Sequence, residues 1–362
     1  MSVERGFLLL ADISGYTGYL ADTELDHAHE ILSELLGEVV RGLTPPLALA
    51  AIEGDAVFAY GPLERGEAVL EAAETTYLAF LQLRDVMEAR TTCQCNACRR
   101  LRSLDLKFVV HHGEYTLQGL TGTPNPIGSD VNLAHRLLKN SVIERTGFQS
   151  YVILTQAALD ATGIPPNGLT AGAESYEHLG DIAVWSYDLA ARAHLLAAAQ
   201  EPDVSIATSD WFTEIELPAP PVVVWEWLND VQKVGLWHDE RVRFEEQHRG
   251  VDGRSGVGSV VHCHHGAKNP YAIEVTDWRP FEFVGEEFAA RRGVRVRVVN
   301  ELEPLGNGRT LLRQGFRLFT PLPGALRRLL CRRVVEAETE ANLERLRARL
   351  DELARQPEPA HA

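Results

Sequence analysis

The sequence has few cysteines and no long apolar run, and these absences exclude several classes of protein. Only 5 of the 362 residues are cysteine, and they do not suit a disulfide framework because their number is odd. A reducing compartment is favoured, so we expect a cytoplasmic protein. The early apolar stretch FLLLA is interrupted by Asp12 and is far shorter than the roughly 20 residues that span a bilayer. The sequence therefore predicts no transmembrane segment.

Positive charge is also scarce. The chain has 35 Lys and Arg residues against 51 Asp and Glu residues, for a formal net charge of −16. A chain of this charge repels nucleic acid and anionic membranes as a whole, although a local basic pocket for a phosphate is compatible with it. With 45% hydrophobic and 24% charged residues, the composition is that of an ordinary folded protein. We expect no nucleic-acid partner.

The length suits two domains better than one core. Around residues 191–206 an Ala-rich helical pattern ends, and a polar segment with Pro202 leads into new strands. We place the domains at residues 1–198 and 207–355. In the first, strands and helices alternate, which predicts an α+β sandwich around an antiparallel sheet. The second reads as a strand, a Pro-led helix, a run of strands and one long amphipathic helix.

The expected elements of the first domain follow from apolar periodicity and turn residues. They are a strand at 7–12, helices over about 16–43, a hairpin broken at 53–55, a helix over about 65–90, strands at 105–112 and 114–119, and a helix within 126–140.

Two carboxylates stand where strands end. Asp12 closes the first strand, and Asp55 lies at the tip of the hairpin. If that strand lies beside the hairpin, both carboxylates meet at one edge of the sheet, where such a pair favours Mg²⁺ or Mn²⁺. Taken singly, Asp12 also fits a helix cap and Asp55 a turn residue. The turn after Asp12 places backbone N–H groups at the start of a helix, where a phosphate group can bind. The residues of this turn are Ser14, Gly15, Tyr16 and Thr17.

Three motifs in order resemble the class III adenylate/guanylate cyclase catalytic domain. LLADISGYT is similar to that family's strand and turn F-x-D-I-x-G-F-T, and IEGDAVFAY to its hairpin. HHGEYTLQGLTGTPNPIGSDVNLAHRL is similar to its H-x-G strand pair and the helix that follows. The resemblance covers about residues 5–190 and implies a ferredoxin-like cyclase sandwich.

The resemblance also implies roles for individual residues. Asp12 and Asp55 fall on two metal-binding aspartates, so two Mg²⁺ or Mn²⁺ ions are implied. Asn132 falls on the asparagine that orients the ribose, and Arg136 on the arginine that stabilises the pentacoordinate phosphorus. The implied reaction is attack of a nucleoside triphosphate's 3′-hydroxyl on its own α-phosphate. In the family, metals come from one chain and Asn/Arg from the other, which implies a homodimer.

Some positions depart from the family. Ala51 stands where the family has its adenine-selecting lysine, and Ser129 stands where the partner aspartate is expected, with Asp130 displaced by one residue. No lysine in HLGDIAVWSYDL matches the one that binds the triphosphate. Two interpretations stay open: an active cyclase with altered base selection, and a non-catalytic nucleotide- or lipid-binding regulatory protein with a degenerate cyclase fold.

The cysteine cluster CQCNAC lies outside these motifs. Its thiols, those of Cys93, Cys95 and Cys98, suit a soft metal such as Zn²⁺, with His111 or His112 as a fourth ligand. A loop of free or redox-sensitive thiols is the alternative.

The second domain resembles the START-like helix-grip family (SRPBCC), which includes polyketide cyclase/dehydrase-like proteins. The resemblance covers about residues 207–355 and depends on the architecture and on FTEIELPAPPVVVWEWLNDVQKVGLWH. It implies a cavity for a lipid or another hydrophobic small molecule. The aromatic residues expected to line it, or to form plain core, are Trp225, Trp227, Trp237 and Phe283. Together the two resemblances predict a signalling protein whose hydrophobic ligand modulates a nucleotide site.

Overall fold

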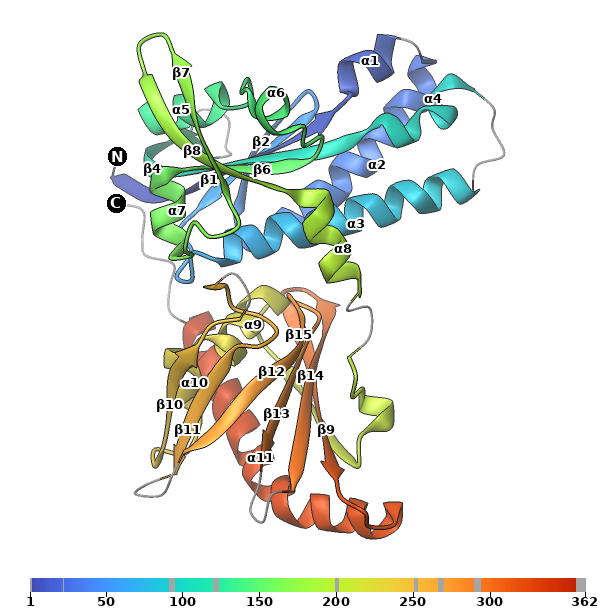
Figure 1. The fold of residues 1–362 in the computed structure, drawn as a ribbon, viewed down its shortest axis with the longest axis vertical. Helices are drawn as coiled ribbons and strands as arrows, with labels where there is room; N and C mark the ends of the chain where they lie inside the picture. Colours follow the sequence, from blue (N-terminus) through green and yellow to red (C-terminus); the bar gives the residue numbers. More distant parts are fainter. Residues whose placement is uncertain are drawn as a thin grey trace. The chain divides into compact units, whose positions relative to one another are not determined.

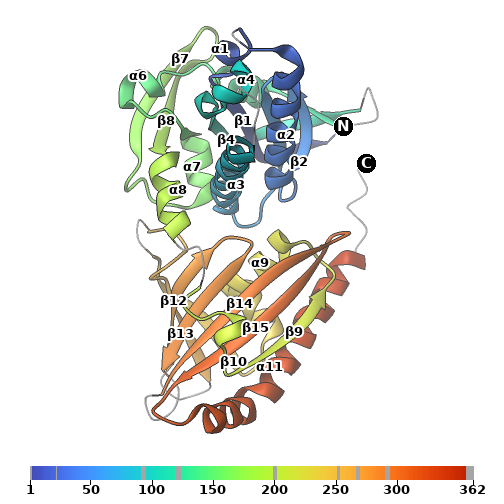
Figure 2. The same cartoon turned by 90° about the vertical axis from the view of Figure 1, so that its right-hand side faces the viewer.

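The chain folds into two compact units. The computed structural model describes residues 2–21, 23–90, 95–119, 124–198, 202–250, 253–265, 270–289 and 294–355. Unit 1 runs from Met1 to Ala197 and unit 2 from Ala198 to Ala360 (Figures 1 and 2). Both units mix helices and strands, which confirms the predicted α+β class. Among the described helices, none is long and apolar enough to cross a bilayer.

Unit 1 is built on one sheet, sheet A. Its strands follow the order β2-β3-β1-β4-β6-β8-β7, and β5 pairs with β4 outside that path. The pairing of β4 with β6 is parallel, and the other pairings are antiparallel. The strands are β1 (Val3–Ser14), β2 (Ala48–Glu53), β3 (Ala56–Gly61), β4 (Asp105–Gln118), β5 (Asn125–Ile127), β6 (Tyr151–Thr155), β7 (Thr170–Tyr176) and β8 (Gly180–Asp188).

Helices cover both faces of sheet A (Figure 1). α2 (Leu25–Leu43) and α3 (Ala68–Arg90) pack side by side on one face, and α5 (Ser129–Arg136) packs on the other. α5 buries Val131 and Leu133 in the core cluster that contains Leu10 of β1. The other helices are α1 (Tyr16–Ala21), α4 (Asn96–Arg99), η1 (Leu101–Ser103), α6 (Val142–Thr146), α7 (Gln156–Thr162) and α8 (Leu189–Ala198).

The first strand, predicted at 7–12, is longer in the structure, and the strand β4 differs more. The strands expected at 105–112 and 114–119 form a single strand, β4, with Gly113 in its interior. A Cβ at Gly113 would overlap the carboxylate of Asp130, which accepts a hydrogen bond from the backbone N–H of Glu114 at 2.6 Å. The glycine does not end the strand. Its lack of a side chain lets α5 approach the backbone of β4 closely.

Unit 2 has the predicted helix-grip arrangement. Its antiparallel sheet, sheet B, has the strand order β10-β11-β12-β13-β14-β15-β9, and α11 (Gly324–Arg355) runs across one face (Figure 2). The strands are β9 (Trp211–Leu217), β10 (Val242–His248), β11 (Val260–His265), β12 (Tyr271–Arg279), β13 (Phe283–Ala289), β14 (Arg295–Gly306) and β15 (Arg309–Phe319). The shorter helices are η2 (Ile206–Thr208), α9 (Pro221–Asn229) and α10 (Val231–Trp237).

The aromatic residues singled out in the second domain are buried. Trp225 is 0% exposed, and its ring centroid lies 4.7 Å from that of Trp278. Trp227 and Trp237 belong to the same core cluster, and Phe283 is buried as well. These side chains therefore serve as core, the alternative that the sequence left open.

Candidate functional site

The first strand and the hairpin bring two carboxylates to one edge of sheet A. β1 pairs with β3 so that Asp12 lies opposite Ala56, and the N–H of Ile13 donates to the carbonyl oxygen of Asp55 at 3.1 Å. This confirms that the first strand lies beside the hairpin. Burial and the charge of Asp12 both raise the pKa of the Asp55 carboxyl. A cation bound there would relieve this repulsion.

Lys107 occupies the same edge, although the sequence did not single it out. It lies opposite Asp12 across the β1–β4 pairing, and its Nζ is 2.9 Å from Oδ2 of Asp12. The two side chains are only 19% and 15% exposed. Burial acts to lower the pKa of Lys107, but the hydrogen bond and charge of Asp12 outweigh it and raise that pKa. The only sequence signal was a lysine within the apolar run LKFVV.

The turn after Asp12 is tightly enclosed. Gly15 has φ +85°, and a Cβ there would overlap the carbonyl oxygen of Ser103 in η1. The hydroxyl oxygen of Ser14 is buried, and no described residue forms a hydrogen bond with it. Tyr16 and Thr17 begin α1, which has only 6 residues and therefore adds little to an anion site. Phosphate binding at this turn stays a prediction.

Gly15→Ala should lower the free energy of unfolding of unit 1 by about 2–4 kcal/mol, because strain at positive φ adds to the overlap with Ser103. Gly54→Ala is the matched control, since Gly54 has φ +66° but no atom within 4 Å of the added Cβ. The control should lose only about 1 kcal/mol. Native-state hydrogen exchange of β1 at increasing urea measures both losses. Equal losses would show that the turn simply moves away from Ser103.

The helix α5 presents the two residues implied for transition-state chemistry. Asn132 and Arg136 are exposed, and i,i+4 spacing places them on one face. Their side chains have no partner among the described residues, and no described interaction joins them to Asp12 or Asp55. One chain therefore presents two separate pairs of candidate residues, Asp12 with Asp55 and Asn132 with Arg136.

The positions that depart from the cyclase pattern have different surroundings. Ser129 is exposed at the first position of α5, and Ala51 is partly buried on β2. Asp130 faces β4, where it accepts the hydrogen bond from Glu114 and lies 3.5 Å from Nε2 of His111. The displaced aspartate therefore attaches α5 to β4.

The cysteine cluster lies beside a histidine that the sequence did not pair with it. Cys93 is outside the described residues, but Cys95 and Cys98 lie close to His27 of α2. Nδ1 of His111 is instead 2.8 Å from the hydroxyl oxygen of Thr155, and the ring of His112 packs against that of Phe7. The histidine that lies beside the described cysteines is therefore His27, whereas the predicted His111 and His112 contact other residues.

Unit 2 carries an acidic side chain on the core face of its sheet. Glu286 lies between Val275 of β12 and Val298 of β14, which are both buried, and strand alternation gives it the same face as Val284. Burial raises the pKa of Glu286 to about 7. No described residue forms a hydrogen bond with its carboxyl group, and the indole N–H of Trp225 is also buried without a partner. Glu286 is thus a partly buried acid beside apolar residues, and the Trp225 indole N–H is enclosed in the apolar core.

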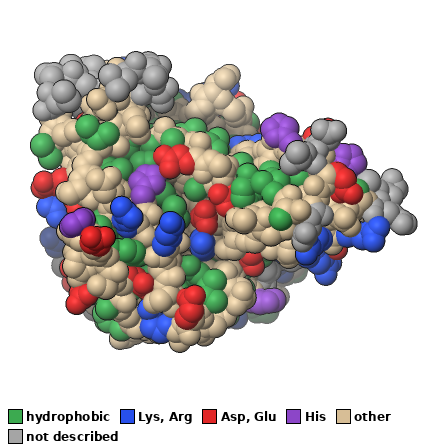
Figure 3. Space-filling model, turned by 90° about the horizontal axis from the view of Figure 1, so that it is seen from above, with side chains coloured by type: hydrophobic (Ala, Val, Ile, Leu, Met, Phe, Trp, Pro, Cys, Tyr) green, Lys and Arg blue, Asp and Glu red, His purple; other side chains and the backbone are tan. Residues whose placement is uncertain are grey.

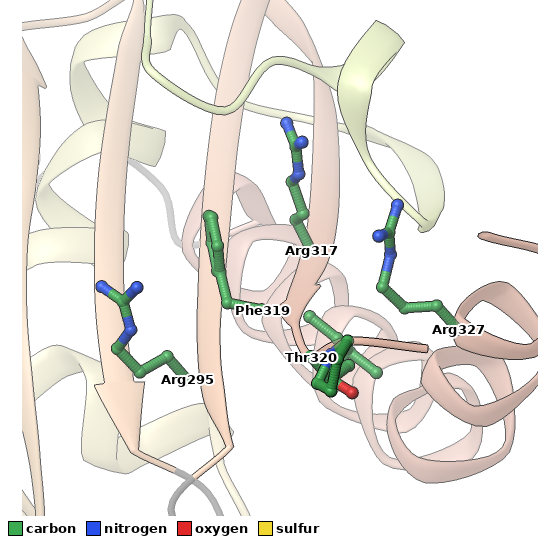
Figure 4. A pocket seen from close by; sticks show the side chains of 7 residues that line it. Arg295, Arg317, Phe319, Thr320 and Arg327 are labelled. Carbon is green, nitrogen blue, oxygen red and sulfur yellow. The ribbon is translucent and has the colours of Figure 1, made fainter. Parts of the chain in front are cut away.

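A pocket of about 310 Å³ opens where β14, β15 and the start of α11 meet (Figure 4). The guanidinium carbons of Arg295 and Arg317 lie 5.1 and 5.6 Å from the ring centre of Phe319. Arg327 is paired with Asp210 at 2.6 Å. This pocket is basic, and the buried aromatic residues predicted for a cavity do not line it. It is therefore a different feature from the predicted apolar cavity.

Charges of both signs are mixed on the face shown in Figure 3. Acidic and basic side chains stand among hydrophobic ones there. Neither sign of charge forms one continuous patch on the described part of that face.

Family models match both halves of the chain. Residues 32–146 match a family described as a protein of unknown function, DUF2652. Residues 212–351 match the family described as polyketide cyclase / dehydrase and lipid transport. Residues 212–351 form a domain of this second family. The START-like resemblance predicted for the second domain is thereby confirmed.

Similar proteins are known for parts of the chain. An uncharacterized protein of Mycobacterium tuberculosis, Rv2561/Rv2562, is 31% identical over 112 residues, which are 31% of this chain and 52% of that protein. The chain thus spans about half the length of this relative. The guanylyl cyclase Cya2 is 15% identical, with a TM-score of 0.40 over 51% of this chain and 92% of that one. The adenylyl cyclase CyaB from P. aeruginosa is 14% identical, with a TM-score of 0.39 over 51% and 95%.

Proposed function

We propose that unit 1 binds a nucleoside triphosphate together with Mg²⁺ or Mn²⁺ at the edge formed by Asp12 and Asp55. The observation that carries the proposal is the meeting of these carboxylates, with Lys107 beside them. Cyclase-like motifs contribute both aspartates and the exposed Asn132 and Arg136. In this proposal the protein is a signalling protein, and a hydrophobic molecule bound by unit 2 modulates the nucleotide site.

The residues at this edge fit hard divalent ions. Asp12 and Asp55 offer carboxylate oxygens, the ligands that Mg²⁺ and Mn²⁺ prefer, and the raised pKa of Asp55 reflects a crowding that a cation would relieve. The unpartnered hydroxyl of Ser14 is a further oxygen nearby in the chain. Bound ions would polarise a phosphate group and neutralise its charge.

Lys107 is the cation that this chain itself supplies. Its ammonium group is held 2.9 Å from Asp12 and is largely buried, so its charge acts at short range. Phosphate oxygens bound beside Asp12 would accept hydrogen bonds from it. Lys107 thus offers an anchor for the triphosphate, which the final hairpin does not provide.

The finer function that we propose is cyclisation of the nucleotide by a homodimer. Asn132 and Arg136 are exposed and have no side-chain partner among the described residues, so they are free to reach a nucleotide held by a second copy. Arg136 would stabilise charge on the phosphorus and Asn132 would orient the ribose. Ala51 and Ser129 lack the functional groups that select adenine, which supports altered base selection.

For unit 2 we propose a mostly hydrophobic ligand that carries a polar group. The indole N–H of Trp225 is buried without a partner, and the partly buried Glu286 has no hydrogen bond from a described residue, so a ligand that hydrogen-bonds either of them would offset part of the cost of burying it. The match to a family described as including lipid transport supports the same class of ligand.

The thiols of the described cysteines also support a cellular location. They form no disulfide among the described residues, which favours a reducing cytoplasmic compartment; these are Cys95, Cys98, Cys263 and Cys331.

The second candidate is a non-catalytic nucleotide-binding regulator. Two observations favour it: Lys107 already neutralises Asp12, and Asp130 is engaged with β4. In this case the nucleotide binds at the same edge but no product forms.

The test is incubation of the purified chain with each nucleoside triphosphate and Mn²⁺, followed by mass spectrometry for a cyclic product. A cyclic product supports the cyclase if Arg136→Ala no longer forms it and Lys139→Ala still does. Lys139 is the control because it is exposed and three residues away. Binding without product supports the regulator. Absence of both binding and product overturns the nucleotide proposal.

A further inference from the structure

A histidine and two cysteines from distant parts of the chain converge in unit 1. His27 lies in the first turn of α2, Cys95 precedes α4, and Cys98 lies within α4. One ligand atom from each lies within 4.8 Å of the others, and Nδ1 of His27 is 3.3 Å from the sulfur of Cys95. Figure 1 shows α4 close to the beginning of α2. None of these side chains belongs to the nucleotide edge.

The backbone around the cysteines is held in place by other contacts. The carboxylate of Glu24 accepts hydrogen bonds from the N–H groups of Asn96 and Ala97, at 3.0 and 3.3 Å. The hydroxyl of Tyr19 donates to the carbonyl oxygen of Ala97 at 3.1 Å. Because these bonds need no metal, the two sulfur positions are set before any ion binds. A site prepared in this way loses little conformational entropy on binding.

The chemistry of the three ligand atoms points to a soft, tetrahedral ion. Zn²⁺ binds thiolates at about 2.3 Å and imidazole nitrogen at about 2.0–2.1 Å, so its ligand atoms lie roughly 3.5–3.8 Å apart. The observed group needs only small shifts to reach this spacing. The N–H of Cys98 also donates to the sulfur of Cys95 at 3.4 Å, and such a bond stabilises a thiolate. Carboxylate-preferring ions such as Mg²⁺ do not suit two sulfurs.

We propose that His27, Cys95 and Cys98 bind one Zn²⁺ ion that ties α4 to α2. This ligand set replaces the set of three cysteines that the sequence suggested. The site is structural in effect, because α4 leads directly into η1, whose Ser103 abuts Gly15 in the turn after Asp12. The ion therefore stabilises the support of the nucleotide edge without taking part in its chemistry.

The experiment is performed on the full chain purified without chelator. Elemental analysis should find one Zn²⁺ per chain, and replacement by Co²⁺ should give the absorption bands of a thiolate-bound tetrahedral ion. His27→Ala and Cys98→Ser should each lower Zn²⁺ affinity at least 100-fold in competition with a chromogenic chelator. His29→Ala, an exposed histidine on the same helix, is the matched control and should leave the affinity unchanged.

A second measurement separates loss of metal from loss of folding. Chelation of the wild-type chain should speed tryptic cleavage after Arg99 and Arg100, while the His27→Ala chain should be cleaved fast with or without chelator. Three results would overturn the proposal. They are an absence of bound metal in the wild type, full affinity in His27→Ala with loss only in Cys93→Ser, and a Cys95–Cys98 disulfide in protein purified under reducing conditions.

Discussion

Asp12→Asn and Asp55→Asn should both abolish metal-dependent nucleotide binding by unit 1, yet shift its stability in opposite directions. Each change removes a charged oxygen ligand, and we expect affinity for the nucleotide in Mn²⁺ to fall at least 100-fold in both. Asp12→Asn also leaves the largely buried Lys107 without its ion pair, which should cost about 2–3 kcal/mol. Asp55→Asn removes a carboxylate that burial and Asp12 both disfavour, so it should leave stability equal or up to about 1 kcal/mol higher.

Calorimetry measures the nucleotide affinity, and hydrogen exchange of β1 and β3 measures the local stability. Lys107→Met is the companion variant, because it removes the other half of the ion pair and keeps both carboxylates. Nucleotide affinity in Lys107→Met should fall, whereas that in Lys139→Met, an exposed change, should not. Equal stability losses in Asp12→Asn and Asp55→Asn would contradict the arrangement described for this edge.

Glu286→Gln should stabilise unit 2 at pH 8 and change little at pH 5. Burial raises the pKa of Glu286 from 4.5 to about 7, so between these values the folded state holds a proton that the unfolded state has released. The free energy of unfolding therefore falls as pH rises through this window, by up to about 3 kcal/mol. Glutamine cannot ionise, so the variant avoids this loss. Above pH 7 its advantage should be a few kcal/mol.

The measurement is urea unfolding of both chains at several pH values. Trp185 is the only tryptophan of unit 1, so tryptophan fluorescence reports mainly on unit 2. Glu274→Gln, an exposed change on the neighbouring strand β12, is the control and should track the wild type at every pH. A difference between Glu286→Gln and wild type that does not change with pH would show that Glu286 is ionised in the folded state.

Local patterns in the sequence were enough to predict the main elements of the site. Asp12 follows an apolar run near the end of β1 (Val3–Ser14), and Asp55 marks a hairpin tip; these signals depend on neighbouring residues alone. The same holds for α5, since the apolar residues at helical spacing, among them Val131 and Ala134, are buried, and Asn132 and Arg136 are exposed. The helix-grip arrangement of unit 2 followed from its order of elements.

Features that depend on tertiary pairing were missed for a physical reason. Lys107 is important only because the β1–β4 register sets it opposite Asp12. His27 is 68 residues from Cys95, so no local spacing connects them. Gly113 looked like a strand break. The reason for a glycine there is the nearby carboxylate of Asp130, which lies on another element. In each case the decisive partner lies on an element that the local pattern does not identify.

The most direct test of the nucleotide site is a calorimetric titration of the wild-type chain and Asp55→Asn with a nucleoside triphosphate, each in Mn²⁺ and in chelator. The nucleotide should bind to the wild type in Mn²⁺ alone, and binding should be lost in Asp55→Asn although its β1 and β3 stay as protected from hydrogen exchange as in the wild type. Equal affinity in the two chains, or equal affinity with and without Mn²⁺, would contradict a metal-dependent site at the edge formed by Asp12 and Asp55.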